Sequence, residues 1–294
     1  MSLDVRSAKL LDLVDSGAQV EQIGTGCVFT EGPIWDAEGD FLLFSDIPAN
    51  QMKKWTSDSG ITTFRQPSGK SNGLTYDKQK RLIACEHANR RVSRTESDGT
   101  VTTIASHYEE KKLNSPNDVV VKSDGSIYFT DPPYGLTAMY GEEGGQELDF
   151  QGVYRLSEDG QELTLLVDDF DRPNGLCFSP DESVLYVDDT ARMHVRAFDV
   201  QSDGTLANGR IFAEEEGENG VPDGMKVDQQ GNVYLTGPRG VWVFDPAGTH
   251  LGVIQVPEVT ANLGWGENDW KTLFITATTS IYRIQLKVSG IPVP

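Results

Sequence analysis

Six polar residues, each at the start of a short apolar run, are the side chains of this chain best suited to chemistry. Two are carboxylates and four are amides, so all six offer oxygen atoms. Oxygen ligands of low total charge are the set that favours calcium or magnesium over zinc. If they meet at one point, these side chains predict a site for a divalent cation. The six residues are Glu31, Asn72, Asn117, Asn174, Asp223 and Asn262.

The stretch from 113 to 135 indicates how one of these residues is positioned. Asn117 precedes a run of three valines, a turn at Asp124-Gly125 and a return run that ends at Asp131. β-Branched and aromatic runs on either side of an Asp-Gly pair are a strong short-range signal for a hairpin. Because the two ends of a hairpin lie together, we expect Asn117 and Asp131 at the same end of this one.

The same pattern recurs in six copies, and the opening residues lie 39 to 57 positions apart. Four short strands and their turns need about 40 residues, the usual size of a propeller blade. The sequence therefore predicts an all-β fold, a single six-bladed β-propeller domain over residues 1–294. The sixth copy ends after its third strand, so we expect residues 19–23 to join the last blade and close the ring. Residues 1–18 are then an N-terminal extension, with helical periodicity over 6–14.

The third copy is the longest because it contains a glycine-rich, acidic insertion at residues 136–149. This insertion leaves the strand that ends at Asp131, so it should overhang the end where Asn117 lies. Long loops at such positions often carry function. We expect a lid-like segment at the rim of a pocket.

Propeller geometry determines where the opening residues go. The innermost strand of each blade lines the central channel, so the six opening side chains should converge on one axis at one end. Two carboxylates without a counter-charge would repel each other there, and a bound divalent cation resolves the repulsion. The alternative is that the Asn-Gly and Asp-Gly pairs are only turn residues that cap the blades.

Four short motifs on this framework match a known family. They are Glu31-Gly32-Pro33, Asn117-Asp118 within LNSPNDVV, Asn174-Gly175 and Pro222-Asp223-Gly224-Met225. Over roughly residues 25–286 the chain resembles the SMP-30/gluconolactonase family, which includes regucalcin and luciferin-regenerating enzyme. The motifs LNSPND and TDPPYG look most like the bacterial and fungal gluconolactonases. One departure is Ser115, because some animal members carry an arginine two positions before the first-strand asparagine.

This resemblance implies a divalent-metal-dependent lactone hydrolase that acts on a sugar lactone such as glucono-1,5-lactone. It implies one divalent cation, with calcium expected first and magnesium, manganese or zinc as alternatives. The implied ligands are Glu31, Asn117, Asn174 and Asp223, with Asn117 on the metal or on the substrate. Asp223 would also move a proton from the attacking water to the leaving alkoxide. Two alternatives stay open: a phosphotriesterase-like hydrolase on the same metal, and a non-catalytic calcium-binding or interaction propeller.

Substrate contacts are expected from Asn117, Asn72, His87, Asp131 and Tyr134. His87 follows the second strand of its blade and should stand on the metal-binding face, where it contacts substrate, assists as a base or forms only a structural hydrogen bond. Asn72 and Asn262 either bond substrate hydroxyls or cap strands. Tyr140 and Met139 of the insertion are further candidates for the pocket wall.

Composition excludes other classes of partner. The chain has 25 basic and 45 acidic residues and a formal charge of −20 at pH 7, which would repel a phosphate backbone, so no nucleic acid is expected. No apolar run approaches the ~20 residues that span a bilayer, so no membrane partner is expected. The N-terminal residues lack the apolar core of a secretory signal, which favours the cytoplasm unless a leader was removed. A small-molecule substrate is the one partner implied, and the acidic run 214–218 is expected to be a solvated loop.

Overall fold

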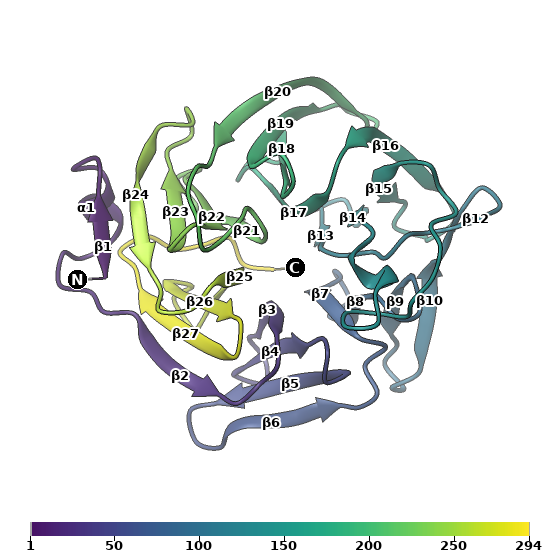
Figure 1. Ribbon diagram of the computed structural model, residues 1–294, viewed down its shortest axis with the longest axis horizontal. Coiled ribbons are helices and arrows are strands. Elements are labelled where there is room, and N and C mark those ends of the chain that lie inside the picture. The colour runs from purple at the N-terminus through teal and green to yellow at the C-terminus, as the bar shows by residue number, and fades with distance from the viewer. Residues whose placement is uncertain (1, 294) are drawn as a thin grey trace.

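The computed structural model describes residues 2–293, and its strands form six antiparallel blades around a central axis (Figure 1). This architecture confirms the predicted six-bladed β-propeller. A separate two-stranded hairpin precedes blade 3, formed by β11 (His107–Tyr108) and β12 (Lys111–Lys112). Within residues 2–293, no helix combines the length and the apolar character needed to cross a membrane.

The first three blades each contain four consecutive strands, which run in order from the axis outward. Blade 1 has β3 (Thr30–Asp36), β4 (Phe41–Asp46), β5 (Gln51–Thr56) and β6 (Gly60–Arg65). Blade 2 has β7 (Ser71–Tyr76), β8 (Leu82–Glu86), β9 (Arg91–Thr95) and β10 (Val101–Ala105). Blade 3 has β13 (Val119–Val121), β14 (Ile127–Asp131), β15 (Gln151–Leu156) and β16 (Leu163–Phe170). The predicted hairpin is β13 and β14, in which Val119 pairs with Phe129.

The last three blades differ in how they are completed. Blade 4 has β17 (Pro173–Phe178), β18 (Val184–Asp189), β19 (His194–Val200) and β20 (Leu206–Glu214). Blade 5 has β21 (Met225–Val227), β22 (Val233–Gly237), β23 (Gly240–Phe244) and β24 (His250–Gln255). Blade 6 has only three consecutive strands, β25 (Thr260–Gly266), β26 (Thr272–Ala277) and β27 (Ser280–Gln285).

The N-terminal residues complete the last two blades. Strand β2 (Glu21–Thr25) pairs antiparallel with β27, so the N-terminal strand closes the ring as predicted, two residues later than expected. Strand β1 (Leu3–Val5) adds a fifth strand to blade 5 by pairing with β24, which the sequence did not predict. The helix predicted over 6–14 shrinks to the single turn α1 (Leu10–Leu13). So short a helix depends on packing, which Leu10 and Leu13 provide because both are buried.

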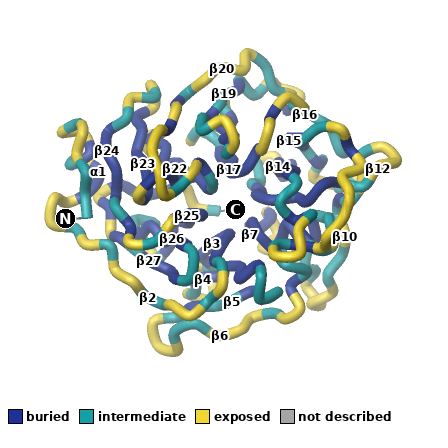
Figure 2. Tube along the Cα trace, viewed as in Figure 1, coloured by how far each residue is buried: buried dark blue, intermediate teal, exposed yellow. Residues whose placement is uncertain are grey.

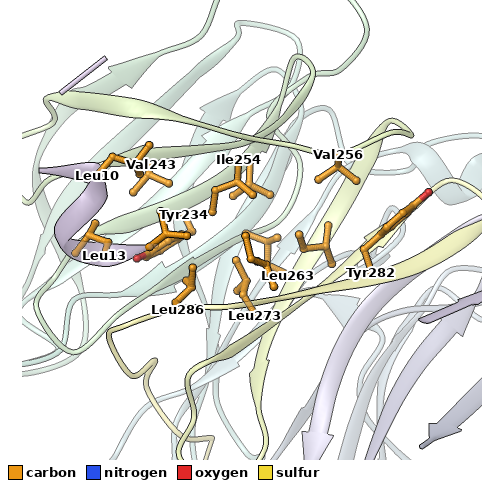
Figure 3. Close-up of a cluster of buried hydrophobic side chains, with 14 of the residues drawn as sticks. Leu10, Leu13, Tyr234, Val243, Ile254, Val256, Leu263, Leu273, Tyr282 and Leu286 are labelled. Atoms are coloured by element: carbon orange, nitrogen blue, oxygen red, sulfur yellow. The ribbon is translucent and has the colours of Figure 1, made fainter. Parts of the chain in front are cut away.

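Apolar side chains between neighbouring blades form the core. The inner strands are buried, whereas much of the outermost strands is exposed (Figure 2). Figure 3 shows the cluster between blades 5 and 6, where Leu263 and Leu273 of blade 6 lie near Tyr234 and Ile254 of blade 5. Leu10 and Leu13 cover the outer side of this cluster. This packing holds each inner strand, and so each opening residue, in a fixed place.

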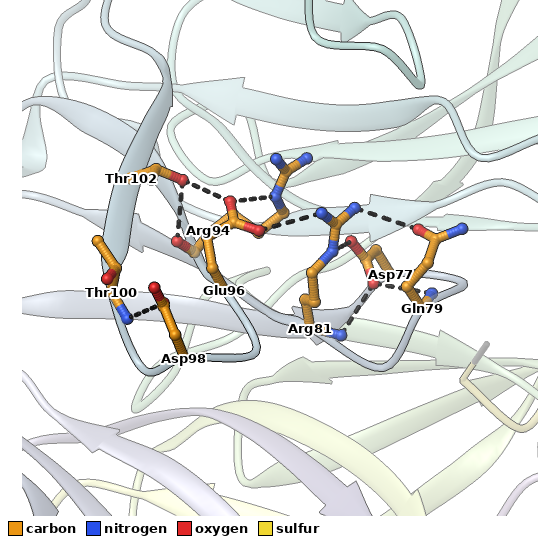
Figure 4. A network of polar contacts seen from close by, with 8 residues as sticks. All are labelled: Asp77, Gln79, Arg81, Arg94, Glu96, Asp98, Thr100 and Thr102. Atoms are coloured by element: carbon orange, nitrogen blue, oxygen red, sulfur yellow. Dashed lines mark hydrogen bonds and ion pairs between the residues drawn. The ribbon is translucent and has the colours of Figure 1, made fainter.

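Polar contacts fix the turns at the opposite ends of the inner strands. In blade 2 the Asp77 carboxylate accepts the Arg81 Nε–H at 2.7 Å, and Arg81 also reaches Glu96 at 3.1 Å (Figure 4). In blade 5 Asp228 similarly accepts the N–H groups of Gln230 and Asn232. These carboxylates replace backbone partners in tight turns, so their role is to determine turn geometry.

Leu263→Ala is expected to lower the free energy of unfolding by about 2–5 kcal/mol, because it leaves a cavity between blades 5 and 6. Urea denaturation measures the loss, with Phe64→Ala as the matched control because Phe64 is 45% exposed. A loss no larger than that of the control would contradict the packing described.

Candidate active site

A cavity of about 160 Å³ lies at the end of the axis where the inner strands begin. Five of the six opening residues line it: Glu31, Asn72, Asn117, Asn174 and Asp223. Asp223 is partly exposed, and the other four are buried. The remaining lining residues are mainly aromatic or aliphatic: Phe29, Ile47, His87, Tyr134, Tyr140, Thr190 and Val221. The structure therefore brings the four predicted metal ligands into one cavity, each from a different blade.

Asn262, the sixth opening residue, does not line the cavity. Its Nδ2 donates to Glu31 Oε2 at 3.0 Å, and its Oδ1 accepts the Leu263 N–H at 2.8 Å. The Gly32 N–H donates to the same Glu31 oxygen at 2.7 Å. Asn262 therefore orients Glu31, a role that sequence alone could not separate from strand capping.

Asn174 is held in a comparable way on the other side of the cavity. Its Nδ2 donates to Thr190 Oγ1 at 3.0 Å, and the Thr190 hydroxyl donates to the Pro222 carbonyl at 2.8 Å. This chain of bonds joins blade 4 to the segment that carries Asp223. Thr190 was not predicted, because nothing in its sequence context separates it from other strand-end hydroxyl residues.

The two carboxylates of the cavity oppose each other's ionisation. Burial raises the pKa of Glu31 to about 7, and the charge of Asp118 contributes. Burial also raises the pKa of Asp223 well above its usual range, and the nearby charge of Glu31 raises it further. Since the hydrogen bonds from Asn262 and Gly32 only partly offset this, the site favours a positive charge between the two groups.

The donor set suits a hard cation. Asn72 Oδ1, in the cavity lining, is buried without a hydrogen-bond partner among residues 2–293. The same part of the chain contains no group of three or more His, Cys, Asp or Glu side chains placed to hold a metal. A cation in this cavity would therefore depend on amide oxygens as well as carboxylates, which favours calcium or magnesium over zinc.

His87 lines the cavity and makes two hydrogen bonds. Its Nδ1 lies 3.2 Å from the Tyr140 carbonyl and its Nε2 lies 3.4 Å from Asn72 Nδ2. A carbonyl can only accept and an amide nitrogen can only donate, so the network assigns the proton to Nδ1. Burial lowers the pKa of His87 to about 4, so the ring is neutral at pH 7. These bonds give His87 a structural role in addition to its place in the cavity wall.

Asp131 does not line the cavity, unlike the other expected substrate contacts. Its carboxylate accepts the N–H groups of Asn114 and Ser115, each at 2.8 Å. Although both bonds favour the charged form, burial raises the pKa of Asp131 to about 7. The expectation that Asp131 contacts substrate is therefore corrected: it holds the loop that precedes Asn117.

A sequence signal for this role exists in other blades. Asp46 and Asp189 also end the second strand of their blades, and each accepts N–H groups from the loop before its own inner strand. An aspartate that recurs at this position in three blades therefore indicates a loop support. Tyr134, in contrast, lies in the cavity wall, with the Arg172 guanidinium 5.7 Å from its ring centroid.

The chain contains one Gly-x-Ser-x-Gly sequence, at residues 69–73, which in other proteins marks a serine nucleophile. Here it enters β7 and not a strand-to-helix turn. Ser71 is fully buried, and its Oγ lies 2.9 Å from Ser45 Oγ. Because this hydroxyl bonds another serine and not a histidine, the arrangement does not support a serine esterase.

The acidic run 214–218 is exposed as predicted except at Glu215, which is 5% exposed. Both Glu215 carboxylate oxygens are buried without a partner in the described residues. Gly237 lies against this carboxylate and leaves no room for a larger residue. Burial alone raises the pKa of Glu215 to about 9.

The comparisons with known proteins agree with this geometry. Residues 29–279 match the model of the SMP-30/gluconolactonase/LRE-like region. The chain belongs to this family. It is 36% identical to a gluconolactonase of Zymomonas mobilis, over 97% of this chain and 86% of that protein. It is 27% identical to regucalcin of Bos taurus, over 85% and 83% of the two chains.

A solved structure shows the same shape. The structure of a gluconolactonase from Xanthomonas campestris superposes with a TM-score of 0.91 at 34% identity, over 97% of this chain and 95% of that chain. The two proteins therefore share one fold over nearly the whole of both chains.

Asp131→Ala is expected to lower the free energy of unfolding by about 2–4 kcal/mol, because it leaves two buried N–H groups without an acceptor. Urea denaturation tests this, with the exposed Asp149→Ala as control. Equal stability of the two variants would show that Asp131 does not support the loop.

Glu215→Met is expected to stabilise the protein increasingly as pH rises from about 4.5 to 9. The folded state keeps the Glu215 proton up to about pH 9, whereas the unfolded chain loses it near 4.5. Stability of the natural protein therefore falls across this window. Thermal unfolding at pH 5 and pH 8 measures the difference, and exposed Glu216→Met is the control. A gain that does not grow with pH would contradict a protonated Glu215.

Proposed function

We propose that this protein is a divalent-metal-dependent hydrolase of a sugar lactone such as glucono-1,5-lactone. The observation that carries the proposal is the convergence of Glu31 and Asp223, with raised pKa values, beside Asn117 and Asn174 in one cavity. Membership of the family and 36% identity to a gluconolactonase support the reaction class. The proposed cofactor is one divalent cation, with calcium first.

Each residue has a distinct role in this proposal. Glu31, Asn117, Asn174 and Asp223 would hold the cation. When bound, the cation would supply Lewis-acid polarisation of the lactone carbonyl and offset the charge of the two carboxylates. Asp223 takes a proton from the attacking water as the water oxygen bonds to the carbonyl carbon of the lactone. It returns that proton to the ring oxygen when the carbon–oxygen ester bond breaks, which leaves a hydroxy acid.

The cavity suits a small, polar, cyclic substrate. Its volume of about 160 Å³ lies below the range of drug-sized pockets, which is roughly 300–1,000 Å³. Asn72 and Asn117 provide amide groups for substrate hydroxyls, while Tyr134 and Ile47 provide apolar surface for a ring face. These are the contacts that a monosaccharide lactone requires.

Chelator-treated protein should regain hydrolysis of glucono-1,5-lactone when calcium, magnesium, manganese or zinc is added back. The release of protons measures the hydrolysis. Asp223→Asn should lower kcat by about 10²- to 10⁴-fold, because a positioned acid–base group contributes that much. The exposed Asp58→Asn serves as the control. Undiminished turnover in folded Asp223→Asn would remove this residue from the mechanism, and no turnover with any ion would overturn the proposed activity.

A further inference from the structure

The insertion between β14 and β15 is attached to blade 2 by a lysine. Lys70 Nζ donates to the carbonyl oxygens of Ala138 at 2.7 Å and Gly141 at 2.9 Å, and Met139 O lies at 3.5 Å. These carbonyls are the partners of the ammonium group, which forms no ion pair with a carboxylate of residues 2–293. An ammonium that bonds several carbonyls of one loop fixes the path of that loop.

Lys70 is itself held in place. Its backbone N–H donates to Asn50 Oδ1 at 2.8 Å, and its carbonyl accepts the His87 N–H at 3.2 Å. His87 Nδ1 in turn bonds the Tyr140 carbonyl at 3.2 Å. Lys70 and His87 therefore both form hydrogen bonds with the same four-residue stretch of the insertion, 138–141.

A second attachment lies further along the insertion. Arg90 lies 3.4 Å from the Gly145 carbonyl and 3.6 Å from the Glu147 carboxylate. Glu147 also accepts the Lys112 N–H at 2.9 Å. The insertion thus contacts its neighbours in both halves of its length, and it forms one wall of the cavity.

Tyr140 is a side chain of the insertion that lines the cavity. Its ring meets the Phe29 ring of the loop before blade 1 edge-on, with centroids 5.5 Å apart and planes at 74°. Burial raises the pKa of Tyr140, and the charges of Asp223 and Glu31 raise it further. Tyr140 lines the same cavity as both carboxylates, and through its contact with Phe29 the insertion reaches from blade 3 to the loop before blade 1.

We propose that Tyr140 determines which lactones the cavity accepts, and that Lys70 is the positioning residue that holds Tyr140 there. This inference rests on the proposed lactone hydrolysis. With the wall fixed, the cavity admits the lactone of a single sugar acid and excludes the lactone of a disaccharide acid, whose second ring would collide with Tyr140.

Amide hydrogen exchange tests whether Lys70 positions the insertion, and this test does not depend on enzyme activity. Lys70→Met keeps the length of the side chain but removes its donors, and it should speed exchange of the Gly141 amide, which bonds the Thr137 carbonyl at 2.8 Å. Lys70→Arg should restore slow exchange, and the exposed Lys80→Met should behave as the natural protein does. Unchanged exchange in Lys70→Met would overturn the positioning role.

Kinetics with glucono-1,5-lactone and cellobiono-1,5-lactone test specificity. Tyr140→Ala and Lys70→Met should raise KM for the single-sugar lactone about 10-fold with kcat nearly unchanged, and lower the preference for it over the disaccharide lactone. Tyr140→Phe should retain the preference, because it keeps the ring. A natural protein that turns over neither lactone contradicts the proposed function, whereas an active protein whose preference survives Tyr140→Ala contradicts this inference alone.

Discussion

Two carboxylates that line one cavity on the propeller axis, the buried Glu31 and the partly exposed Asp223, are the constraint on which this structure depends. Glu31 and Asp223 come from blades 1 and 5, and burial raises the pKa of both. Such a pair is tolerated only with a positive charge or a shared proton, and both demand accurate placement. Asn262 of blade 6 bonds Glu31 directly, and Thr190 at the end of a blade 4 strand bonds the Pro222 carbonyl next to Asp223.

Ring closure explains how side chains far apart in sequence keep that placement. Each donor belongs to a different blade, so a shift of one blade would move one donor away from the others. Strand β2 joins the first residues to the last blade, and the aliphatic cluster around Leu263 locks blade 6 against blade 5. The same rigid frame supports the insertion, whose attachment by Lys70 and Arg90 extends the frame over the cavity.

The repeat could be predicted from sequence because six polar opening residues, four of them followed by glycine, recur at a spacing that fits one blade. The same register predicted that all six opening residues would meet, and every one except Asn262 lines the cavity. Asp131 was assigned wrongly because one hairpin does not show which way its terminal carboxylate points. The sequence predicted neither strand β1 nor the contact of Tyr140 with Phe29. Strand β1 depends on its pairing with β24, and Tyr140 depends on a ring from the loop before blade 1. Both contacts join residues far apart in the chain, so the local sequence pattern does not reveal them.

Calorimetric titration of chelator-treated protein with calcium, in buffers of different ionisation enthalpy, tests the central claim most directly. Because the Glu31 and Asp223 carboxyls hold protons more tightly than usual, binding of a cation should release protons near pH 6. The predicted result is that one ion binds per chain with release of protons, and that Glu31→Gln abolishes this binding. No binding of calcium or magnesium, or binding that Glu31→Gln leaves unchanged, would contradict a cation site on the propeller axis.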